Sequence, residues 1–588
     1  MDYNILAELY ENLTATSKRL EKTYLISKFL KRIHKSDAEN IVNLIQGQVF
    51  PTWEERKIGV NAKIVIKALS SSSGIDPDNI NKELNKLGDL GLVAEKLVKT
   101  KTQSTLHSIK LTTKKVYENI RKLAELEGQG TINKKIGLIS ELLTSATPIE
   151  AKYIIRTLLE DMRIGVSEGT LRDALVWAYF GDKLGLKYNE KENDFIAPSR
   201  LKYDEYIEKV QIAYDLCSDY SIIIEKLIKH GEKGLDEIKL TIGKPINVML
   251  YQKAKNIEEG FQIVGKPAII EYKYDGFRVL VHKLDNKIIL FTRRLENVTQ
   301  QFPDIIEAVK KYVKGNNFIL DGEVIGIDPK TKKWMPFQAI SQRIKRKYDI
   351  EELTKKVPVM LNIFDIIAFE DKNLINKPLK ERRILIEKII TPGKDILEPA
   401  RQIITSDLKT AEEFYKESLD LGNEGIMMKN INSVYKPGSR VGFGIKVKPI
   451  LETLDLVITG AEWGEGKRTS WLSSFELSCL SEDKKRLLTI GKVGTGIKEK
   501  EEEGVSFEEL TNLLRPLIEE TKGQEVRLTP KIVVEIAYEE IQKSTNYESG
   551  FALRFPRLIT IRYDLGTKDA KTIDDVKKIY ELQRGRNK

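Results

Sequence analysis

The octapeptide from Glu271 to Arg278, EYKYDGFR, contains the residue types with which a protein could attack phosphorus. Lys273 stands two residues before an Asp-Gly pair, with a carboxylate before it and an arginine after it. The flanking residues 268–270 and 279–281 are apolar and typical of strands, so the octapeptide is predicted to be a turn between two antiparallel strands. Lys273 would then lie at a strand end, on a rigid support.

A nucleophilic lysine needs surroundings that lower its pKa. An ordinary lysine is protonated near pH 7, and an ammonium group has no lone pair with which to attack. Neighbouring cations, a bound metal ion and partial desolvation would each lower the pKa of Lys273, so we expect a site rich in Lys and Arg. Taken alone, Lys-Tyr-Asp-Gly is equally consistent with a surface turn that carries a solvated lysine.

Further short clusters follow this turn, each at the end of a β-like run and each with a group that suits a nucleotide. An ordinary sheet with polar strand ends would also produce such clusters, but it predicts no particular order. The clusters are TRRLENVT at 292–299, FILDGEVI at 318–325, LNIFDII at 361–367, NEGIMMK at 423–429, YKPGSR at 435–440 and GIKVKP at 444–449.

This ordered series resembles the nucleotidyltransferase core of ATP-dependent DNA ligases and their relatives, the RNA ligases and mRNA capping enzymes. The resemblance runs from about residue 245 to the C-terminus. It implies that Lys273 takes up AMP from ATP through a phosphoramide bond. AMP would then pass to the 5′-phosphate at a nick in duplex DNA, and the 3′-hydroxyl would displace it, as in replication, repair and recombination.

The resemblance also implies roles for residues that bind the nucleotide. Glu271 is expected on the adenine side, and Phe364 is expected to stack on adenine. Arg278 and Arg293 match arginines that hold ribose and phosphate oxygens, a task that suits a planar, permanently charged group. Glu323 matches the acid near the ribose and the metal. The expected phosphate ligands are Arg440 and Lys446, with Lys448 in support.

Magnesium is expected because pyrophosphate leaves with charge that must be neutralised, and Mg²⁺ does this through oxygen ligands. Glu323 and Glu424 are the candidate metal ligands. Asp321 is an alternative, since it lies two residues from Glu323 and so points to the same face of a strand. Glu424 is also consistent with an ordinary salt-bridge partner.

The sequence departs from the family pattern in two places. Gly442-Phe443-Gly444 stands where many relatives carry a Trp before the paired lysines. Residues 553–557 and 562–564 resemble the last motif of the family, but Leu565 occupies a position where relatives often have lysine. Lys568 is an alternative source of that charge, and the residues that orient pyrophosphate therefore stay unassigned.

The first part of the chain has a helical pattern, with apolar residues at three- and four-residue spacing. Within it, residues 161–173, DMRIGVSEGTLRD, resemble a signature of the DNA-binding domain of archaeal and eukaryotic replicative ligases. Ser167 or Thr170 could cap a helix whose N-terminal amides face a phosphate. A plain helix-loop-helix corner is the alternative.

We therefore predict a multidomain α+β protein. Residues 1–235 would form an all-α DNA-binding domain, and residues 236–449 an α+β adenylation domain with antiparallel sheets, entered through the extended connector 243–250. Residues 450–588 contain several short strands, which suit a small barrel, and by resemblance form an OB-fold β-barrel with a C-terminal helix.

Composition sets limits on this interpretation. The chain has 588 residues, 41% of them hydrophobic, and 97 Lys plus Arg against 87 Asp plus Glu, a modest excess of +10 that favours a polyanion without requiring one. Cys217 and Cys479 are far apart, which excludes a disulfide framework and a four-cysteine zinc site. With no signal peptide and no apolar run of about 20 residues, we expect a cytoplasmic protein.

The expected partner is nicked double-stranded DNA, bound by a monomer. The polar segment from Gln103 to Leu106 faintly resembles the short motif by which such ligases bind a sliding clamp. An RNA ligase or guanylyltransferase of the same superfamily would need Lys273 equally, but not the long helical region before it. A DNA-binding protein that keeps the fold without activity is an alternative from a different class.

Overall fold

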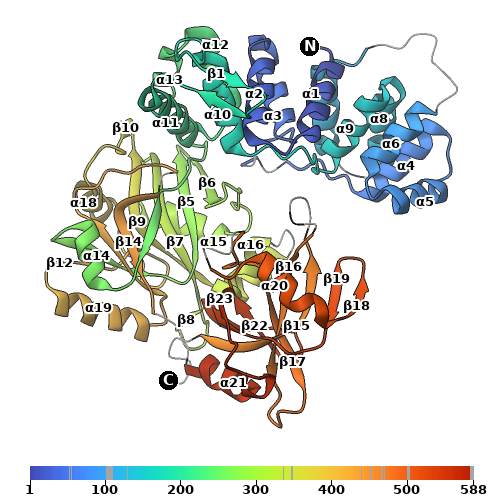
Figure 1. Ribbon diagram of the computed structural model, residues 1–588. Coiled ribbons are helices and arrows are strands. Elements are labelled where there is room, and N and C mark those ends of the chain that lie inside the picture. Colours follow the sequence, from blue (N-terminus) through green and yellow to red (C-terminus); the bar gives the residue numbers. More distant parts are fainter. Residues whose placement is uncertain are drawn as a thin grey trace.

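The computed structural model contains a helical N-terminal region, a two-sheet central region and a β-rich C-terminal region (Figure 1). It describes residues 1–582 except 52, 55, 101–109, 127, 129, 336, 346–348, 439, 450–452, 465–467, 469 and 500–503. The predicted clamp-binding segment, Gln103 to Leu106, lies outside the described residues. None of the helices described is long and apolar enough to cross a membrane.

The N-terminal region is helical as predicted, and one hydrophobic core runs through it from Tyr3 to Ile238. Ser167 caps α10, because its side chain accepts a hydrogen bond from the backbone N–H of Thr170. The small hairpin of β1 (Lys187–Asn189) and β2 (Asp194–Ile196) has no counterpart in the prediction. The helices are α1 Tyr3–Ala15, α2 Arg19–Leu30, α3 Ala38–Ile45, α4 Ala62–Ser73, α5 Pro77–Leu87, α6 Leu90–Lys99, α7 Thr113–Lys122, α8 Thr131–Ser145, α9 Pro148–Leu158, α10 Glu168–Phe180, α11 Arg200–Cys217, α12 Tyr220–His230 and α13 Lys233–Asp236.

The central region contains two sheets of different strand order. In the larger, the order is β10-β9-β7-β5-β6, with β11 on β9 and β8 on β7; in the smaller, it is β12-β4-β13-β14-β3. Most pairs are antiparallel, as predicted; β11 with β9 and β14 with β3 are parallel. The strands are β3 Leu250–Ala254, β4 Ala268–Lys273, β5 Phe277–Leu284, β6 Lys287–Thr292, β7 Asn317–Ile327, β8 Trp334–Met335, β9 Val359–Phe369, β10 Lys372–Asn373, β11 Leu397–Pro399, β12 Gln402–Thr405, β13 Gly425–Asn430 and β14 Arg440–Val447.

One prediction about the Lys273 turn is wrong. Strands β4 and β5 are not antiparallel partners, because β4 pairs with β12 and β13 in the smaller sheet, whereas β5 pairs with β6 and β7 in the larger. The turn at 274–276 therefore carries the chain from one sheet to the other. Lys273 does end its strand, as predicted.

Helices cover these two sheets. In Figure 1, α14 and α19 lie beside the smaller sheet and α18 beside the larger. Apolar residues of β5, β7 and β9 form one core with α15 and α18, and those of β4, β13 and β14 form another with α14 and α19. The helices are α14 Ile257–Val264, α15 Pro303–Tyr312, α16 Phe337–Lys345, α17 Ile350–Lys356, α18 Leu379–Ile389 and α19 Leu408–Asp420.

The C-terminal region has an OB-fold-like arrangement of short strands. The long strand β15 pairs with β16, β19 and β20 at different points along its length, and β20 also pairs with β23. A strand that exchanges partners in this way is typical of a small, strongly curved sheet. The elements are β15 Leu454–Trp463, β16 Leu472–Leu480, β17 Leu487–Val493, α20 Phe507–Leu514, β18 Ile518–Lys522, β19 Glu525–Leu528, β20 Val533–Ala537, β21 Glu540–Lys543, β22 Phe551–Arg554, β23 Arg557–Ile561 and α21 Ile573–Leu582.

Candidate active site

A cavity of about 1370 Å³ lies between the two sheets of the central region. Its walls come from β4, β13 and β14 on one side and from β5, β7 and β9 on the other. The structure places most of the predicted site residues on this one cavity: Glu271, Lys273, Arg278, Arg293, Glu323, Phe364, Glu424 and Lys446.

Strand register explains how the smaller sheet brings its residues together. Lys273 on β4 lies opposite Gly425 on β13, one residue after Glu424. Met427 lies opposite Glu271 on one side and Lys446 on the other. Because alternate residues of a strand share a face, Glu271 and Lys273 project together into the cavity.

Lys273 is held by a carboxylate. Its Nζ atom lies 2.7 Å from Oε2 of Glu424, which also lies 2.6 Å from Nζ of Lys448. Burial alone would lower the pKa of Lys273, but the carboxylates of Glu424 and Glu323 outweigh this effect, so its pKa is raised above that of an ordinary lysine. The pKa of Lys273 is thus not lowered in this structure, because the carboxylates of Glu424 and Glu323 face its amine.

The neighbouring groups respond in opposite directions. Burial would raise the pKa of Glu424, yet the ammonium groups of Lys273 and Lys448 hold it well below the usual range. The pKa of Lys446 is lowered by burial and by the positive charges of Lys273 and Lys448. The cationic environment that the sequence predicts is present, and its effect appears at Lys446.

Glu323 of β7 faces Lys273 from the larger sheet. Burial raises its pKa to about 8, against the opposing effect of Lys273 and Arg278. A metal ion would have to displace a proton from this carboxyl near neutral pH. Among the residues described, no group of three or more Asp, Glu, His or Cys side chains could hold a metal alone. Two carboxylates with substrate phosphates and water suit Mg²⁺, which seldom has an all-protein cage.

Arg278 is fixed by Asp321, the alternative metal ligand. Its Nε and Nη2 atoms donate to the two carboxylate oxygens of Asp321 at 2.8 and 2.5 Å, and its Nη1 donates to the carbonyl of Met249 at 2.7 Å. Tyr435 donates to the same carboxylate at 2.9 Å. Asp321 is fully buried and occupied by these donors, so the geometry favours Glu323 over Asp321 for a metal.

Phe364 lies on β9 close to two cations. The guanidinium carbon of Arg278 is 5.3 Å from the centre of its ring, and Nζ of Lys429 is 4.6 Å from it. The ring lines the cavity, as expected for an aromatic that stacks on a base.

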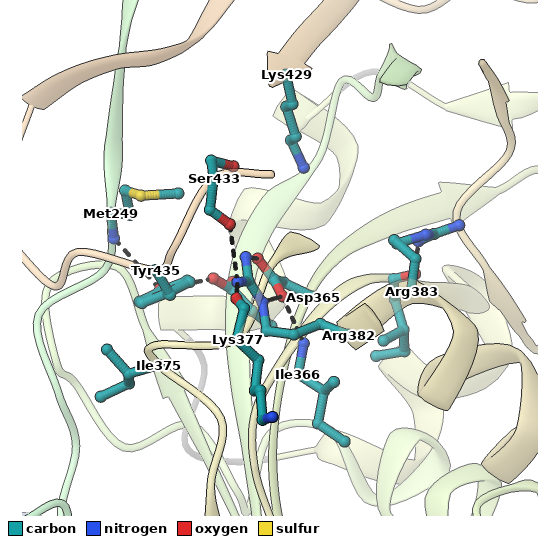
Figure 2. A network of polar contacts seen from close by, with 12 residues as sticks. Met249, Asp365, Ile366, Ile375, Lys377, Arg382, Arg383, Lys429, Ser433 and Tyr435 are labelled. Atoms are coloured by element: carbon teal, nitrogen blue, oxygen red, sulfur yellow. Dashed lines mark hydrogen bonds and ion pairs between the residues drawn. The ribbon is translucent and has the colours of Figure 1, made fainter. Parts of the chain in front are cut away.

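A buried network supports the strand that carries Phe364 (Figure 2). Asp365, the next residue, accepts two hydrogen bonds from Arg382 of α18, at 2.7 and 3.0 Å. Arg382 also donates to the carbonyl of Ser433 at 3.1 Å. Two residues further along, the hydroxyl of Tyr435 donates to the carboxylate of Asp321, which also accepts from Arg278. Both members of the Arg382–Asp365 pair are buried, so the pair ties β9 to the segment that leads into β14. Arg382 gave no signal in the sequence, because nothing in a helical pattern identifies the partner of a buried arginine.

Two of the predicted phosphate-binding arginines, Arg293 and Arg440, lie at the ends of strands. Arg293 is exposed and lines the cavity just beyond the end of β6. Arg440 begins β14 opposite Leu250, but its side chain lies outside the described part of the structure. Of the residues weighed near the last motif, Leu565 packs against the cluster around Val457, and Lys568 is exposed; neither lines the cavity.

Residues outside the central region also approach the site. Glu54 and Lys57 of the helical region line the cavity, a contribution that the sequence analysis missed. From the C-terminal region, Glu539 lies 3.4 Å from Lys448, and Arg554 lies 3.9 Å from Asp275. Such contacts link segments that are distant in the sequence, and no local pattern reveals them.

Family models match three segments of the chain. The model described as "ATP dependent DNA ligase domain" matches residues 248–448, "DNA ligase N terminus" matches residues 2–176, and "ATP dependent DNA ligase C terminal region" matches residues 468–565. These segments fall in the two-sheet, helical and β-rich regions respectively.

Curated relatives match over the full length. A DNA ligase of Nanoarchaeum equitans is 46% identical, with 100% of this chain and 99% of the relative covered. A DNA ligase of Archaeoglobus fulgidus is 41% identical, with 98% of each covered. The solved structure titled "Pmar-Lig_PreS3" has a TM-score of 0.53 at 19% identity and covers 95% of this chain and 99% of that one, a likeness of fold.

Proposed function

The chain belongs to the family of ATP-dependent DNA ligases, and from this premise we propose which of its residues carry out the joining of nicked DNA. The activity is that of an ATP-dependent DNA ligase, and the RNA ligase, guanylyltransferase and inactive-module alternatives are not favoured. The observation that supports the site best is the convergence of Lys273, Glu323 and Lys446, from three strands of two sheets, on one cavity.

Lys273 is the proposed nucleophile. Its Nζ atom forms a bond to the α-phosphorus of ATP, the bond between that phosphorus and the pyrophosphate oxygen breaks, and AMP becomes attached to the protein. The ammonium group must first lose a proton. Loss of the contact with Glu424 would remove the nearest negative charge that favours the protonated form.

The nucleotide is proposed to lie between the two sheets. Phe364 stacks on the base, and Glu271 contacts its edge from β4. Arg278 and Arg293 hold ribose and phosphate oxygens, with Arg278 already oriented by Asp321. Lys446 and Arg440 are the proposed phosphate ligands, supported by Lys448. Cations placed around the α-phosphate would stabilise the charge that develops there in all three steps.

Mg²⁺ is the proposed metal cofactor, with Glu323 and Glu424 as its protein ligands. When bound, it would neutralise the charge of the departing pyrophosphate. Glu424 would then exchange its lysine contacts for the metal, which frees Lys273 from its counterion. This proposal joins the two alternatives for Glu424: it is the salt-bridge partner of Lys273 in the structure and a metal ligand when the substrate is bound.

The regions correspond to proposed domains. Residues 1–235 are the DNA-binding domain, 236–449 the adenylation domain and 450–588 the OB-fold domain with its C-terminal helix. The helical domain would hold the duplex through phosphate contacts, and the OB-fold domain would change its position between steps, because different leaving groups occupy the axial position in turn. We further propose a monomer whose segment from Gln103 to Leu106 contacts a sliding clamp.

Labelling tests the proposal. The protein is incubated with Mg²⁺ and with ATP or GTP labelled at the α-phosphate, and then separated under denaturing conditions. We expect labelled ATP, but not labelled GTP, to label the protein. When a nicked DNA duplex is added, the label should pass to the DNA before the nick is sealed. Labelling by GTP in preference to ATP, or no label at all, would contradict the proposal. If a sliding clamp still stimulates joining fully after Gln103→Ala and Leu106→Ala, the proposed clamp contact is wrong.

A further inference from the structure

A buried lysine occupies the base end of the cavity. Lys429 of β13 is 1% exposed, and its Nζ atom lies 2.5 Å from Oε2 of Glu271, which is 2% exposed. The same nitrogen lies 4.6 Å from the centre of the Phe364 ring. Lys429 thus contacts both residues assigned above to the nucleobase, and it lines the same cavity.

The second oxygen of Glu271 is in a different situation. Oε1 is buried and has no hydrogen-bond partner among the residues that the structure describes. Arg383 approaches it to 3.9 Å, but the two terminal nitrogens of Arg383 donate to the carbonyls of Ile363 and Ala400 instead. A buried acceptor without a donor is costly, and an N–H group of a ligand would satisfy it.

We propose that Lys429 is the positioning residue that gives the site its preference for a 6-aminopurine. Lys429 carries donors only, so it fixes Oε2 of Glu271 and leaves Oε1 free to accept from the exocyclic amine of the base. A 6-oxo purine would instead bring a carbonyl oxygen against a carboxylate that has no proton to donate. The inference rests on the proposed contact of Glu271 and Phe364 with the base.

Strand geometry supports a contact of Lys429 with one oxygen of Glu271 and of the base with the other. Lys429 and Met427 share a face of β13, and Met427 lies opposite Glu271 in the sheet register. Lys429 therefore reaches Glu271 diagonally across the pair of strands β13 and β4. Its Nζ atom also lies near the ring of Phe364 on β9. A lysine at this position restrains the carboxylate and the ring together, which fixes the edge and the plane of the base with one side chain.

A role in positioning differs measurably from a role in folding. Loss of packing would slow reaction with every nucleotide alike, whereas loss of the Lys429 contact would change the preference between nucleotides. We therefore compare second-order rate constants for attachment of nucleotide to Lys273 from two substrates, ATP and purine riboside triphosphate, which lacks the 6-amino group. The ratio of the two constants measures reading of the amino group.

The main variants are Lys429→Met and Lys429→Gln, which both remove the charge and have side chains of similar length. Gln can still donate to Oε2 of Glu271, and Met cannot. We expect Lys429→Met to lower the preference for ATP by about tenfold or more, as for loss of a hydrogen bond to a charged group, and Lys429→Gln to retain most of it. A preference that stays at the wild-type value in Lys429→Met, while both rates fall in parallel, would overturn the proposal.

Two further variants complete the test. If Lys429→Met does not fold, the double variant Glu271→Gln, Lys429→Met replaces it, because this neutral pair leaves no uncompensated charge buried. A double variant that prefers ATP as strongly as the wild-type protein does would also overturn the proposal. Glu271→Ala separates the two levels of inference. If Glu271→Ala keeps the preference for ATP, the assignment of Glu271 to the base is wrong. If it loses the preference while Lys429→Met keeps it, only the role of Lys429 is wrong.

Discussion

The amine of Lys273 lies 2.7 Å from a carboxylate oxygen of Glu424, so the proposed nucleophile forms an ion pair in this structure. Lys448, the residue after the end of β14, shares that oxygen at 2.6 Å. The pKa of Lys273 is raised by this arrangement despite its burial. The amine is therefore held in its protonated form, and we expect it to become reactive when the contact with Glu424 is broken.

The first prediction concerns the pH dependence of self-adenylation. Lys273 must be deprotonated to attack, so the rate should rise as pH passes its pKa, which lies above the ordinary lysine value. Glu424→Gln removes the nearest negative charge and should move this rise to lower pH by about one unit or more, even if the maximal rate falls. Labelling rates at limiting ATP and a constant concentration of Mg²⁺, measured across the pH range, give the shift, because kcat/KM reports the pKa of the free protein.

The control for this experiment is Glu539→Gln. Glu539 contacts Lys448 from the C-terminal region, and in the described part of the structure it forms no ion pair with Lys273, so the pH profile should keep its position. A profile that does not move in Glu424→Gln would show that Glu424 does not set the protonation of Lys273.

The second prediction isolates the nucleophile. Lys273→Ala should form no AMP adduct, and Lys273→Arg should form none either, because a guanidinium remains protonated and cannot attack. Both variants should still seal a nick whose 5′-phosphate already carries AMP, since the 3′-hydroxyl is the nucleophile in that step. Lys253→Ala, at an exposed position on β3, is the control and should label normally. An adduct of unchanged amount in Lys273→Ala would disprove the assignment.

Part of the site was predictable from residue types and their order, since the cavity gathers Glu271, Lys273, Glu323 and Phe364. Of these four, Lys273 ends its strand as predicted, whereas Glu323 and Phe364 lie in the middle of β7 and β9, in the other sheet. Helical periodicity likewise identified the N-terminal region, and Ser167, one of the two candidate caps, does cap α10.

The remainder depended on pairing between distant segments. Nothing near Lys273 shows that β4 and β5 enter different sheets, because strand propensity does not specify a partner. The sequence also did not reveal that Glu424 would outweigh the surrounding cations, which depends on a distance of 2.7 Å fixed by the register of β4 and β13. The approach of Glu54 and Lys57 to the cavity depends on how the helical region packs on the core.

The third prediction tests base stacking. Phe364→Ala should raise the KM for ATP in self-adenylation by about tenfold or more, because base–aromatic stacking contributes about 1–3 kcal/mol. Sealing by enzyme that already carries AMP should slow less, since the nucleotide is then held covalently. Phe364→Trp should keep most of the affinity, and Phe443→Ala, at a residue that does not line the cavity, is the control. A larger effect on sealing than on ATP affinity would assign Phe364 another role.

The fourth prediction tests the helical region as the DNA-binding part. Arg172 of α10 pairs with Asp173 at 2.7 Å and donates to Gln211 at 3.0 Å, within the segment that resembles the family signature. Arg172→Glu should weaken binding to a nicked duplex and reduce its salt dependence, while self-adenylation is unchanged. Binding titrations at several salt concentrations measure the effect. Equal loss of both activities would indicate that Arg172 only supports the fold.

The last prediction concerns the junction of the helical region with the core. Asp215 at the end of α11 is 3% exposed, and its Oδ1 accepts hydrogen bonds from Gln211 and from Asn247 of the connector, both at 3.0 Å. Burial raises the pKa of Asp215 from 3.8 to about 6. The folded state therefore holds this proton more tightly than the unfolded state does.

The sign of the effect follows by linkage. The contribution of Asp215 to stability is complete below the unfolded pKa of 3.8, declines as pH rises, and is lost above about 6. Asp215→Asn keeps the accepting oxygen but carries no charge, so it should stabilise the junction above pH 6 by about 1–3 kcal/mol, and the gain should fade towards pH 4. Unfolding midpoints in denaturant at pH 4.5 and pH 8 measure it, with the exposed Asp236→Asn as control. An equal gain at both pH values, or a loss at pH 8, would show that the charge of Asp215 is compensated at this junction.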